Sequence, residues 1–195
     1  MAGLEPVKAV HKTMALLEML AQQNELGVTD LAERAGIPKS TVYRFLNSLK
    51  YLGYVHQNAS NEKYSLTLKL FELGSSVLSH MELWEQAHPV LELLAEQTHE
   101  TIHLAVIDDG RLVYLGKIES TQALRVSMSS RIGQSAPTYC TGVGKLLLAY
   151  LPPEEVERIL LREGLKRFTE HTITDRSLLY RELENIRRQG FALDN

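Results

Sequence analysis

The stretch that decides the fold runs from Leu31 to Tyr54 and has the sequence LAERAGIPKSTVYRFLNSLKYLGY. Leu31–Ala35 is predicted to form a short helix, and Gly36 after it to supply a tight turn. Pro38 lies where the next helix begins, because its fixed φ and missing N–H are tolerated in a first helical turn. That second helix spans about Lys39–Tyr51 and ends before Gly53, a common residue after a helix C-terminus. The stretch therefore predicts a helix-turn-helix.

The residues on either side extend this motif. Val7–Ala21 is predicted to form a preceding helix, and steps of three and four residues join its apolar stripe of Val7, Val10, Met14, Leu17 and Ala21. Thr29-Asp30 is predicted to cap the start of the short helix. After Gly53, two strands at Tyr54–Gln57 and Lys63–Thr67 flank the polar turn Asn58–Glu62, which indicates a hairpin. Residues 5–67 are thus predicted to be a winged helix-turn-helix domain.

Residues 68–84 regain helical spacing and predict a linker helix. The Gly74-Ser75-Ser76 stretch is a candidate bend, and the exposed apolar residues of this helix could pair with a second chain. Pro89 is expected to open a further helix, Val90–Gln97.

The pattern changes from Thr101 onward. Ile102–Ile107 and Leu112–Leu115 alternate around the turn Asp108–Gly110, which predicts a hairpin. Another strand is predicted at Leu124–Met128, and helices at Thr141–Leu151, Glu154–Arg162 and from Thr174 or Asp175 to Gln189, with Gly190 after the last. Residues 85–195 are thus predicted to be an α+β domain with an antiparallel sheet. Because Phe191-Ala192-Leu193 resembles the start of a strand, we expect the natural domain to continue past Asn195.

Composition and length restrict the functional class. None of the 195 residues belong to an apolar run of roughly 18, the length of a membrane helix, and the start MAGLEPVKAVHK lacks the features of a secretion signal. The single cysteine, Cys140, cannot form an internal disulfide, so a cytoplasmic location is expected. The histidines lack zinc-site spacing, and we predict no metal and no cofactor.

Charge is distributed unevenly along the chain. Between Arg34 and Lys69 there are six basic residues and one acidic residue, a local net charge of +5, whereas the whole chain carries −3. A basic N-terminal module is therefore joined to an acidic one, as expected if only the first meets nucleic acid.

The helix Lys39–Tyr51 commits its apolar face to the core and leaves a polar face outward. In a helix-turn-helix the second helix lies in the major groove, where Arg44 can contact a guanine edge and Ser40 and Thr41 can meet phosphate. We predict that DNA is bound by Lys39, Ser40, Thr41, Tyr43, Arg44, Asn47 and, in the wing, Lys63. The alternative is a solvated helix face in a winged-helix protein-interaction module.

Pro137–Lys145 contains Gly142 and Gly144 just before an apolar helix. Backbone N–H groups at such a helix start bind small anions, including carboxylates. The stretch is not a P-loop, because Lys145 is followed by Leu146. Close helix packing that requires glycine is the alternative reading of the same spacing.

Cys140 with His103 as its base would make an enzyme, the second functional alternative. A lone cysteine beside a helix start more often reflects packing, and His99 and His103 are interpreted as structural. We therefore predict no catalytic residues.

Several of these motifs together resemble one family. The segments Pro38–Leu46, Leu52–Val55, Lys63–Leu66, Glu100–Leu104, Arg131–Gly133, Gly142–Lys145, Thr172–Thr174 and Arg188–Phe191 resemble the IclR family of regulators along essentially the whole chain. Lys63–Gly74 is most similar to the branch that represses sugar-acid degradation, the 2-keto-3-deoxygluconate regulator.

The resemblance implies a repressor of carbohydrate or organic-acid catabolic genes that binds palindromic operator DNA as a homodimer or homotetramer. It also implies a GAF/profilin-like C-terminal domain whose effector is a small carboxylic acid, such as a 2-oxo acid similar to 2-keto-3-deoxygluconate. The effector-binding positions that match the family pattern are Met128, Ala136, Gly142, Val143 and Asp194. The family's remaining ligand residues are expected beyond Asn195.

Overall fold

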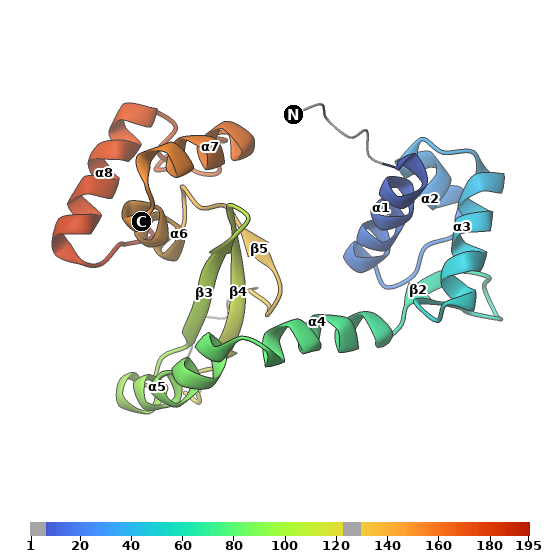
Figure 1. Ribbon diagram of the computed structural model, residues 1–195, viewed down its shortest axis with the longest axis horizontal. Coiled ribbons are helices and arrows are strands. Elements are labelled where there is room, and N and C mark those ends of the chain that lie inside the picture. Colours follow the sequence, from blue (N-terminus) through green and yellow to red (C-terminus); the bar gives the residue numbers. More distant parts are fainter. Residues whose placement is uncertain (1–6, 123–129) are drawn as a thin grey trace. The chain divides into compact units, whose positions relative to one another are not determined.

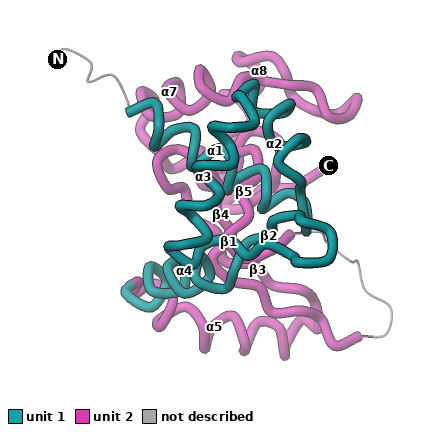
Figure 2. Tube along the Cα trace, turned by 90° about the vertical axis from the view of Figure 1, so that its right-hand side faces the viewer, with its two compact units in different colours: residues 1–80 teal, residues 81–195 magenta. Residues whose placement is uncertain are grey.

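The computed structural model describes residues 7–122 and 130–195, and the chain divides into two compact units, residues 1–80 and 81–195 (Figure 2). Each unit has its own buried apolar cluster. The predicted α+β class is confirmed, with a helix-turn-helix and hairpin in the first unit and an antiparallel sheet with helices in the second. The strand predicted at Leu124–Met128 lies outside the described residues.

The first unit contains four helices and a two-stranded sheet among its described residues, in the order α1 (Lys8–Gln22), α2 (Val28–Ala35), α3 (Lys39–Tyr51), β1 (Val55–Gln57), β2 (Tyr64–Leu66) and α4 (Lys69–Ser79). The predicted second helix of the helix-turn-helix, Lys39–Tyr51, is confirmed at both ends. The predicted wing strands are confirmed to within one residue, and β1 and β2 pair antiparallel with Val55 opposite Leu66.

Of the apolar stripe predicted for α1, only Leu17 is buried. Val7, Val10 and Met14 are 67%, 61% and 51% exposed, and Ala21 is exposed too, whereas the residues that α1 buries are Leu16, Leu17 and Leu20. Two apolar stripes run along this helix, and periodicity could not tell which one meets α2 and β2. The core contains only Leu16, Leu17 and Leu20 of this helix, so the apolar side chains of Val7, Val10 and Met14 remain exposed.

The start of α2 also differs from the prediction. The helix begins at Val28 with Gly27 as its N-cap, so Thr29 and Asp30 lie inside the first turn. The Asp30 carboxylate accepts a hydrogen bond from the Gly27 N–H at 3.4 Å. The capping side chain therefore lies in the first turn of the helix and not at the residue before it. Gly36 ends α2 with φ +61°, a left-handed conformation that glycine adopts without strain.

The linker helix is shorter than predicted, and its expected bend is absent. α4 continues as one α-helix through Gly74–Ser76, and within it the Ser76 hydroxyl donates to the Leu73 carbonyl at 2.8 Å. The helix ends instead before His80-Met81. There the His80 ring binds the Ser76 carbonyl, which would accept the His80 backbone N–H if the helix continued. Trp84 consequently belongs to the following helix.

The second unit contains four helices and a three-stranded sheet among its described residues, in the order α5 (Glu82–Thr98), β3 (Ile102–Asp108), β4 (Arg111–Ile118), β5 (Ser135–Ala136), α6 (Gly142–Tyr150), α7 (Pro153–Glu163) and α8 (Arg176–Gln189). The sheet order is β3-β4-β5, and both pairs are antiparallel. Asp109 and Gly110 both have positive φ, which is the geometry of a tight two-residue hairpin turn and confirms the predicted turn.

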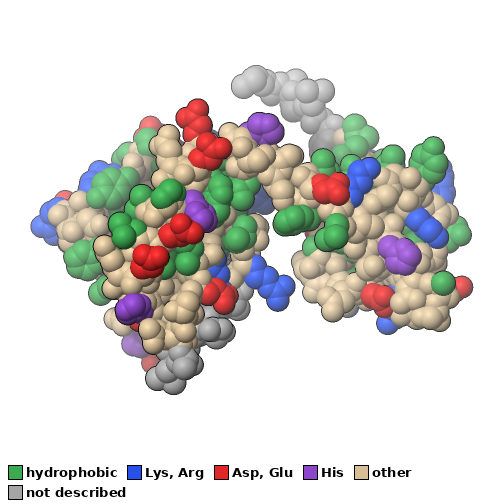
Figure 3. Space-filling model, turned by 90° about the horizontal axis from the view of Figure 1, so that it is seen from below, with side chains coloured by type: hydrophobic (Ala, Val, Ile, Leu, Met, Phe, Trp, Pro, Cys, Tyr) green, Lys and Arg blue, Asp and Glu red, His purple; other side chains and the backbone are tan. Residues whose placement is uncertain are grey.

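The prediction that Pro89 opens a helix was wrong, because Pro89 lies inside α5. Its ring removes one backbone hydrogen bond, which an exposed helix tolerates when water binds the freed carbonyl. Pro89 is exposed. Figure 3 shows apolar and acidic side chains next to one another on the face of the second unit that includes α5.

The helices α6, α7 and α8 form the core of the second unit, away from α5 (Figure 1). Asp175 accepts a hydrogen bond from the Leu178 N–H at 2.9 Å, so it is the predicted cap of α8, and Gly190 ends that helix with φ +82°. Residues 191–195 form no strand, contrary to the prediction from Phe191-Ala192-Leu193. A strand needs a hydrogen-bonded neighbour, and apolar residues alone do not supply one.

No helix within residues 7–122 and 130–195 is both long enough and apolar enough to cross a membrane.

Candidate functional site

The first candidate surface is the outward face of α3. Val42, Leu46 and Leu49 are almost fully buried and hold the helix against the core of the first unit. This burial fixes which side chains face outward, since residues three and four apart share a helical face. The predicted DNA-binding residues on this helix are exposed, apart from the half-buried Thr41: Lys39, Ser40, Thr41, Tyr43, Arg44 and Asn47.

At the start of α3, two backbone amides are bound to the Pro38 carbonyl. The Thr41 N–H donates to the Pro38 carbonyl at 2.9 Å, and the Val42 N–H also donates to it at 3.1 Å. The amides of Lys39 and Ser40 are therefore those at this helix start that could bind a phosphate. In the wing, Lys63 is exposed, and its backbone N–H donates to the Asn61 side chain at 3.0 Å.

The second candidate site lies on one face of the β3–β4 sheet. Residues paired across antiparallel strands share a face, and the register pairs Ala105 with Tyr114 and His103 with Lys117. The opposite face meets α5, where a Cβ on Gly116 would lie 2.2 Å from the Trp84 ring. Because the register shifts between Leu104 and Ala105, Tyr114 lies on the face of His103 and Lys117 and not on that of Gly116, and this face is the one not covered by α5.

The start of α6 supplies backbone amides to the second site. Thr141 is the N-cap, and its hydroxyl accepts a hydrogen bond from the Gly144 N–H at 3.2 Å and donates to the Pro137 carbonyl at 2.9 Å. The Thr141 hydroxyl binds the N–H of Gly144, so the N–H groups of Gly142 and Val143, which come before Gly144 in the first turn of the helix, are not the ones that it caps. Amides in this position point out of a helix start and bind anions.

Asp194 and Gly142 are brought together although 52 positions separate them in the sequence. A Cβ built on Gly142 would lie 3.3 Å from the Asp194 backbone nitrogen. Burial raises the pKa of the Tyr114 hydroxyl, and the charge of Asp194 raises it further. The Asp194 backbone therefore lies against the start of α6, and the Asp194 charge also acts on the Tyr114 hydroxyl.

Of the predicted effector residues, the structure gathers Gly142, Val143 and Asp194 at the α6 start, and Ala136 is placed on β5 opposite Leu112. Met128 lies outside the described residues. Tyr114 was missed in the sequence analysis, because the neighbours of a strand residue can be predicted only when the strand register is known. Strict alternation along β4 would have placed Tyr114 with Gly116 on the face toward α5, because the register shift between Leu104 and Ala105 is not readable from the sequence.

Cys140 and His103 differ from a catalytic pair in their electrostatics. Burial raises the pKa of the Cys140 thiol, and Asp194 and Glu163 raise it further, so the thiolate is disfavoured. Burial and then Lys117 lower the pKa of His103, whose Nε2 lies 2.7 Å from the Ser130 hydroxyl. This arrangement suits a neutral polar wall better than a nucleophile and its base.

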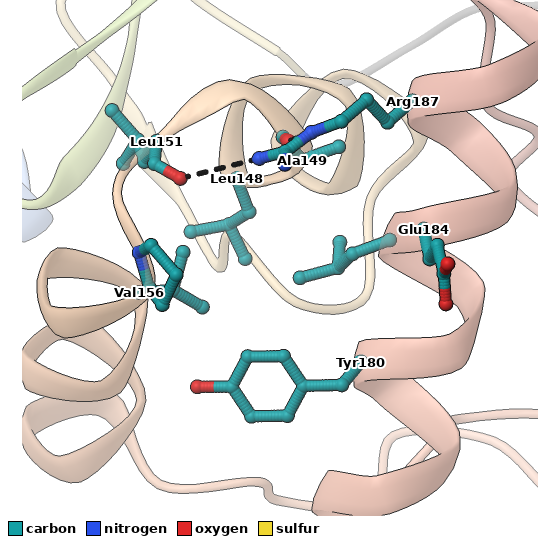
Figure 4. A pocket seen from close by; sticks show the side chains of 9 residues that line it. Leu148, Ala149, Leu151, Val156, Tyr180, Glu184 and Arg187 are labelled. Atoms are coloured by element: carbon teal, nitrogen blue, oxygen red, sulfur yellow. Dashed lines mark hydrogen bonds between the residues drawn. The ribbon is translucent and has the colours of Figure 1, made fainter.

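A separate apolar groove of about 270 Å³ lies between α6, α7 and α8 (Figure 4). Tyr180 points from α8 toward α7, and its hydroxyl donates to Glu157 at 3.0 Å. Arg187 spans the other end and donates to the Ala149 carbonyl at 2.6 Å, which satisfies the C-terminal end of α6. The groove shares none of its lining residues with the predicted effector residues, and Tyr180 and Arg187 at its rim are engaged in these structural bonds.

Both parts of the chain match models of known protein domains. Residues 9–59 match the IclR helix-turn-helix domain, and residues 75–195 match the C-terminal domain of bacterial IclR transcriptional regulators.

Three known proteins show how far the likeness extends. The HTH-type transcriptional regulator KdgR of Escherichia coli K12 is 45% identical over 98% of this chain and 72% of its own length. KdgR of Dickeya chrysanthemi is 44% identical over 98% of this chain, which spans 62% of that protein. A crystal structure of an IclR homologue from Microbacterium hydrocarbonoxydans, in complex with 4-hydroxybenzoate, is 27% identical with a TM-score of 0.77, over 94% of this chain and 75% of that one.

The likeness covers both units, includes α3 and the α6 start, and agrees with the fold described above. This chain therefore belongs to the IclR family of bacterial transcriptional regulators.

Proposed function

We propose that this protein represses genes of carbohydrate or organic-acid catabolism by binding their operators through α3, under the control of a small carboxylic acid. The observation that carries the DNA-binding part is the exposed polar face of α3, fixed by the burial of Val42, Leu46 and Leu49. The local charge of +5 between Arg34 and Lys69 supports it, since phosphate neutralisation contributes much of the affinity for DNA.

Each exposed residue of this surface has a chemically suitable role. Arg44 can donate two hydrogen bonds to a guanine edge, and Tyr43 and Asn47 can contact bases or phosphates beside it. Near the start of α3, the DNA backbone is contacted by Lys39, Ser40 and Thr41. Lys63 contacts the DNA backbone from the wing.

The proposed effector is a hydroxylated 2-oxo acid of the 2-keto-3-deoxygluconate type. Its carboxylate is bound by the amides of Gly142 and Val143, and Asp194 accepts hydrogen bonds from its hydroxyl groups. Ala136, and Met128 among the residues not described, provide apolar walls. Two relatives named KdgR and the 4-hydroxybenzoate complex of a homologue support a carboxylic acid as the ligand class.

We further propose that the protein acts as a homodimer or homotetramer on palindromic DNA. Unburied apolar side chains on two helices of the first unit support this, since such residues favour pairing between chains: Val10 and Met14 on α1, and Phe71 and Val77 on α4. Effector binding would then favour one arrangement of the dimer and change the spacing of the two recognition helices.

The DNA-binding part is tested by selecting binding sites from random duplex DNA and measuring affinity for the selected duplex. Arg44→Ala is expected to lose about 1–3 kcal/mol of binding free energy and to relax selectivity at one base pair. Arg158→Ala, on the exposed surface of α7, is the matched control and should leave affinity unchanged. Unchanged affinity in the Arg44 variant would remove this residue from the recognition surface.

The effector part is tested by a thermal-shift screen of organic acids, with and without the selected duplex. Hydroxylated 2-oxo acids should raise the melting temperature, and Asp194→Asn should reduce the shift more for these acids than for unhydroxylated acids. An equal reduction for both acid types would contradict the role assigned to Asp194.

A further inference from the structure

We propose that Glu25, in the loop between α1 and α2, is a positioning residue for DNA recognition that holds the wing in place. The inference rests on the proposed function, because it assumes that the wing meets DNA. It concerns an acidic residue that no motif or family resemblance singled out.

The Glu25 carboxylate uses both of its oxygens on the turn of the wing. Asn58 Nδ2 donates to Oε1 at 3.0 Å, and Asn61 Nδ2 donates to Oε2 at 2.8 Å. The two amides come from opposite ends of the turn that joins β1 to β2. One side chain therefore ties both ends of the turn to the loop between α1 and α2.

The same two asparagines organise the backbone of the turn. Asn58 Oδ1 accepts the Ser60 N–H at 2.9 Å, and Asn61 Oδ1 accepts the Lys63 N–H at 3.0 Å. The position of each amide thus sets the path of the chain that leads to Lys63. These amide groups are engaged within the protein, which makes Asn58 and Asn61 scaffold residues rather than base readers.

Two further links anchor the wing at its base and its side. Leu26, next to Glu25, pairs with Tyr64 of β2 through backbone hydrogen bonds of 3.0 and 2.9 Å. Lys50, near the end of α3, donates to the Gln57 side chain at 3.0 Å, and Gln57 in turn donates to the Glu62 carbonyl at 3.3 Å. The recognition helix and the Glu25 loop therefore hold the wing from two directions.

A turn fixed before binding loses less conformational entropy when it meets DNA, so fixing it raises affinity without adding a contact. Coulomb energy acts in the opposite direction, because Glu25 is a negative charge in a basic unit. The hydrogen bonds from Asn58 and then Asn61 lower the pKa of Glu25, which keeps this charge at neutral pH. Removing the charge of Glu25 should therefore weaken DNA binding if the ordering of the turn dominates, and strengthen it if charge repulsion dominates.

The test compares Glu25→Gln with Glu62→Gln, which removes an equal charge from the wing turn itself but leaves the Glu62 carbonyl in place. Binding to the selected duplex and to a scrambled duplex is measured by fluorescence anisotropy over a range of salt concentrations. Glu25→Gln should weaken binding to the selected duplex about three- to tenfold, because its amide nitrogen cannot accept from an asparagine amide. Glu62→Gln should bind as tightly as the unaltered protein or more tightly.

A compensating variant checks that the loss comes from the hydrogen bond. Glu25→Gln combined with Asn61→Asp lets the new amide donate to the new carboxylate and restores the original net charge. Its affinity should return toward that of the unaltered protein. If Glu25→Gln alone binds at least as tightly as the unaltered protein, the proposal is overturned.

Hydrogen exchange of the Ser60 and Lys63 amides in the free protein provides a readout that needs no DNA. Both amides should exchange faster in Glu25→Gln and recover in the compensating variant; unchanged exchange would also overturn the proposal. Absence of salt-dependent DNA binding by the unaltered protein would instead contradict the proposed function, and the exchange result would still test the role of Glu25 in the wing.

Discussion

Lys145 Nζ lies 3.1 Å from Glu182 Oε1, and this ion pair joins the first turns of α6 to the middle of α8. The Lys145 side chain is only 10% exposed, whereas that of Glu182 is 33% exposed. Because the start of α6 carries Gly142 and the chain after α8 carries Asp194, the pair links the two elements that form the candidate effector site.

Removing one partner of this pair should destabilise the second unit. Glu182→Gln leaves a buried ammonium without its counter-charge, and we expect a loss of about 1–3 kcal/mol in the free energy of unfolding measured in urea. Arg158→Gln breaks the exposed pair with Glu155 and should change stability by less than about 0.5 kcal/mol. Equal effects of the two substitutions would show that burial of Lys145 does not matter.

The two glycines of the α6 start should respond differently to alanine. A Cβ on Gly144 would lie 2.3 Å from the Thr138 carbonyl oxygen, so Gly144→Ala should cost about 1–3 kcal/mol or more in unfolding experiments. At Gly142 the nearest atom is the Asp194 nitrogen at 3.3 Å, and a shift of a few tenths of an ångström in the exposed residues 193–195 would relieve the contact. Gly142→Ala should therefore fold normally yet weaken acid binding; a large stability loss at Gly142 would contradict this division.

The pH dependence of Cys140 tests the position of Asp194. Burial raises the pKa of the folded thiol above that of an unfolded chain, so the linked stabilisation is complete at neutral pH and is lost as pH rises through the folded pKa. Alkylation by iodoacetamide at pH 8 should accordingly be slower than for a free thiol.

Asp194→Asn should speed the alkylation of Cys140, because it removes the second largest cause of the raised pKa. Asp175→Asn is the matched control, since asparagine also caps a helix and Asp175 is absent from the groups that act on Cys140. If both variants react at the rate of the unaltered protein, Asp194 does not face the thiol.

Local chemistry explains what could be predicted from the sequence. The bounds of α3 and the cap of α8 follow from Pro38, Gly53 and Asp175, whose effects act within a few residues. The turn at Asp109-Gly110 was predictable for the same reason, since its backbone conformation favours those residue types.

The errors arose where a distant element decides the outcome. Which stripe of α1 is buried depends on α2 and β2, and the helix that contains Pro89 continues because its proline faces solvent. At the start of α6, the choice between glycine packing and anion binding depended on which residues lie next to each glycine in the folded protein. Gly144 packs against Thr138, Gly142 lies against Asp194, and the face of the sheet on which Tyr114 lies depends on the strand register.

The most direct test of the central claim is the salt dependence of binding to the selected duplex. If α3 and the wing neutralise phosphates, the logarithm of the association constant should fall linearly with the logarithm of salt concentration, by about 0.9 per neutralised phosphate. Lys63→Ala should reduce this slope by about one for each wing that contacts DNA. Affinity that does not change with salt, or a complete lack of DNA binding, would contradict the account and favour a protein-interaction module.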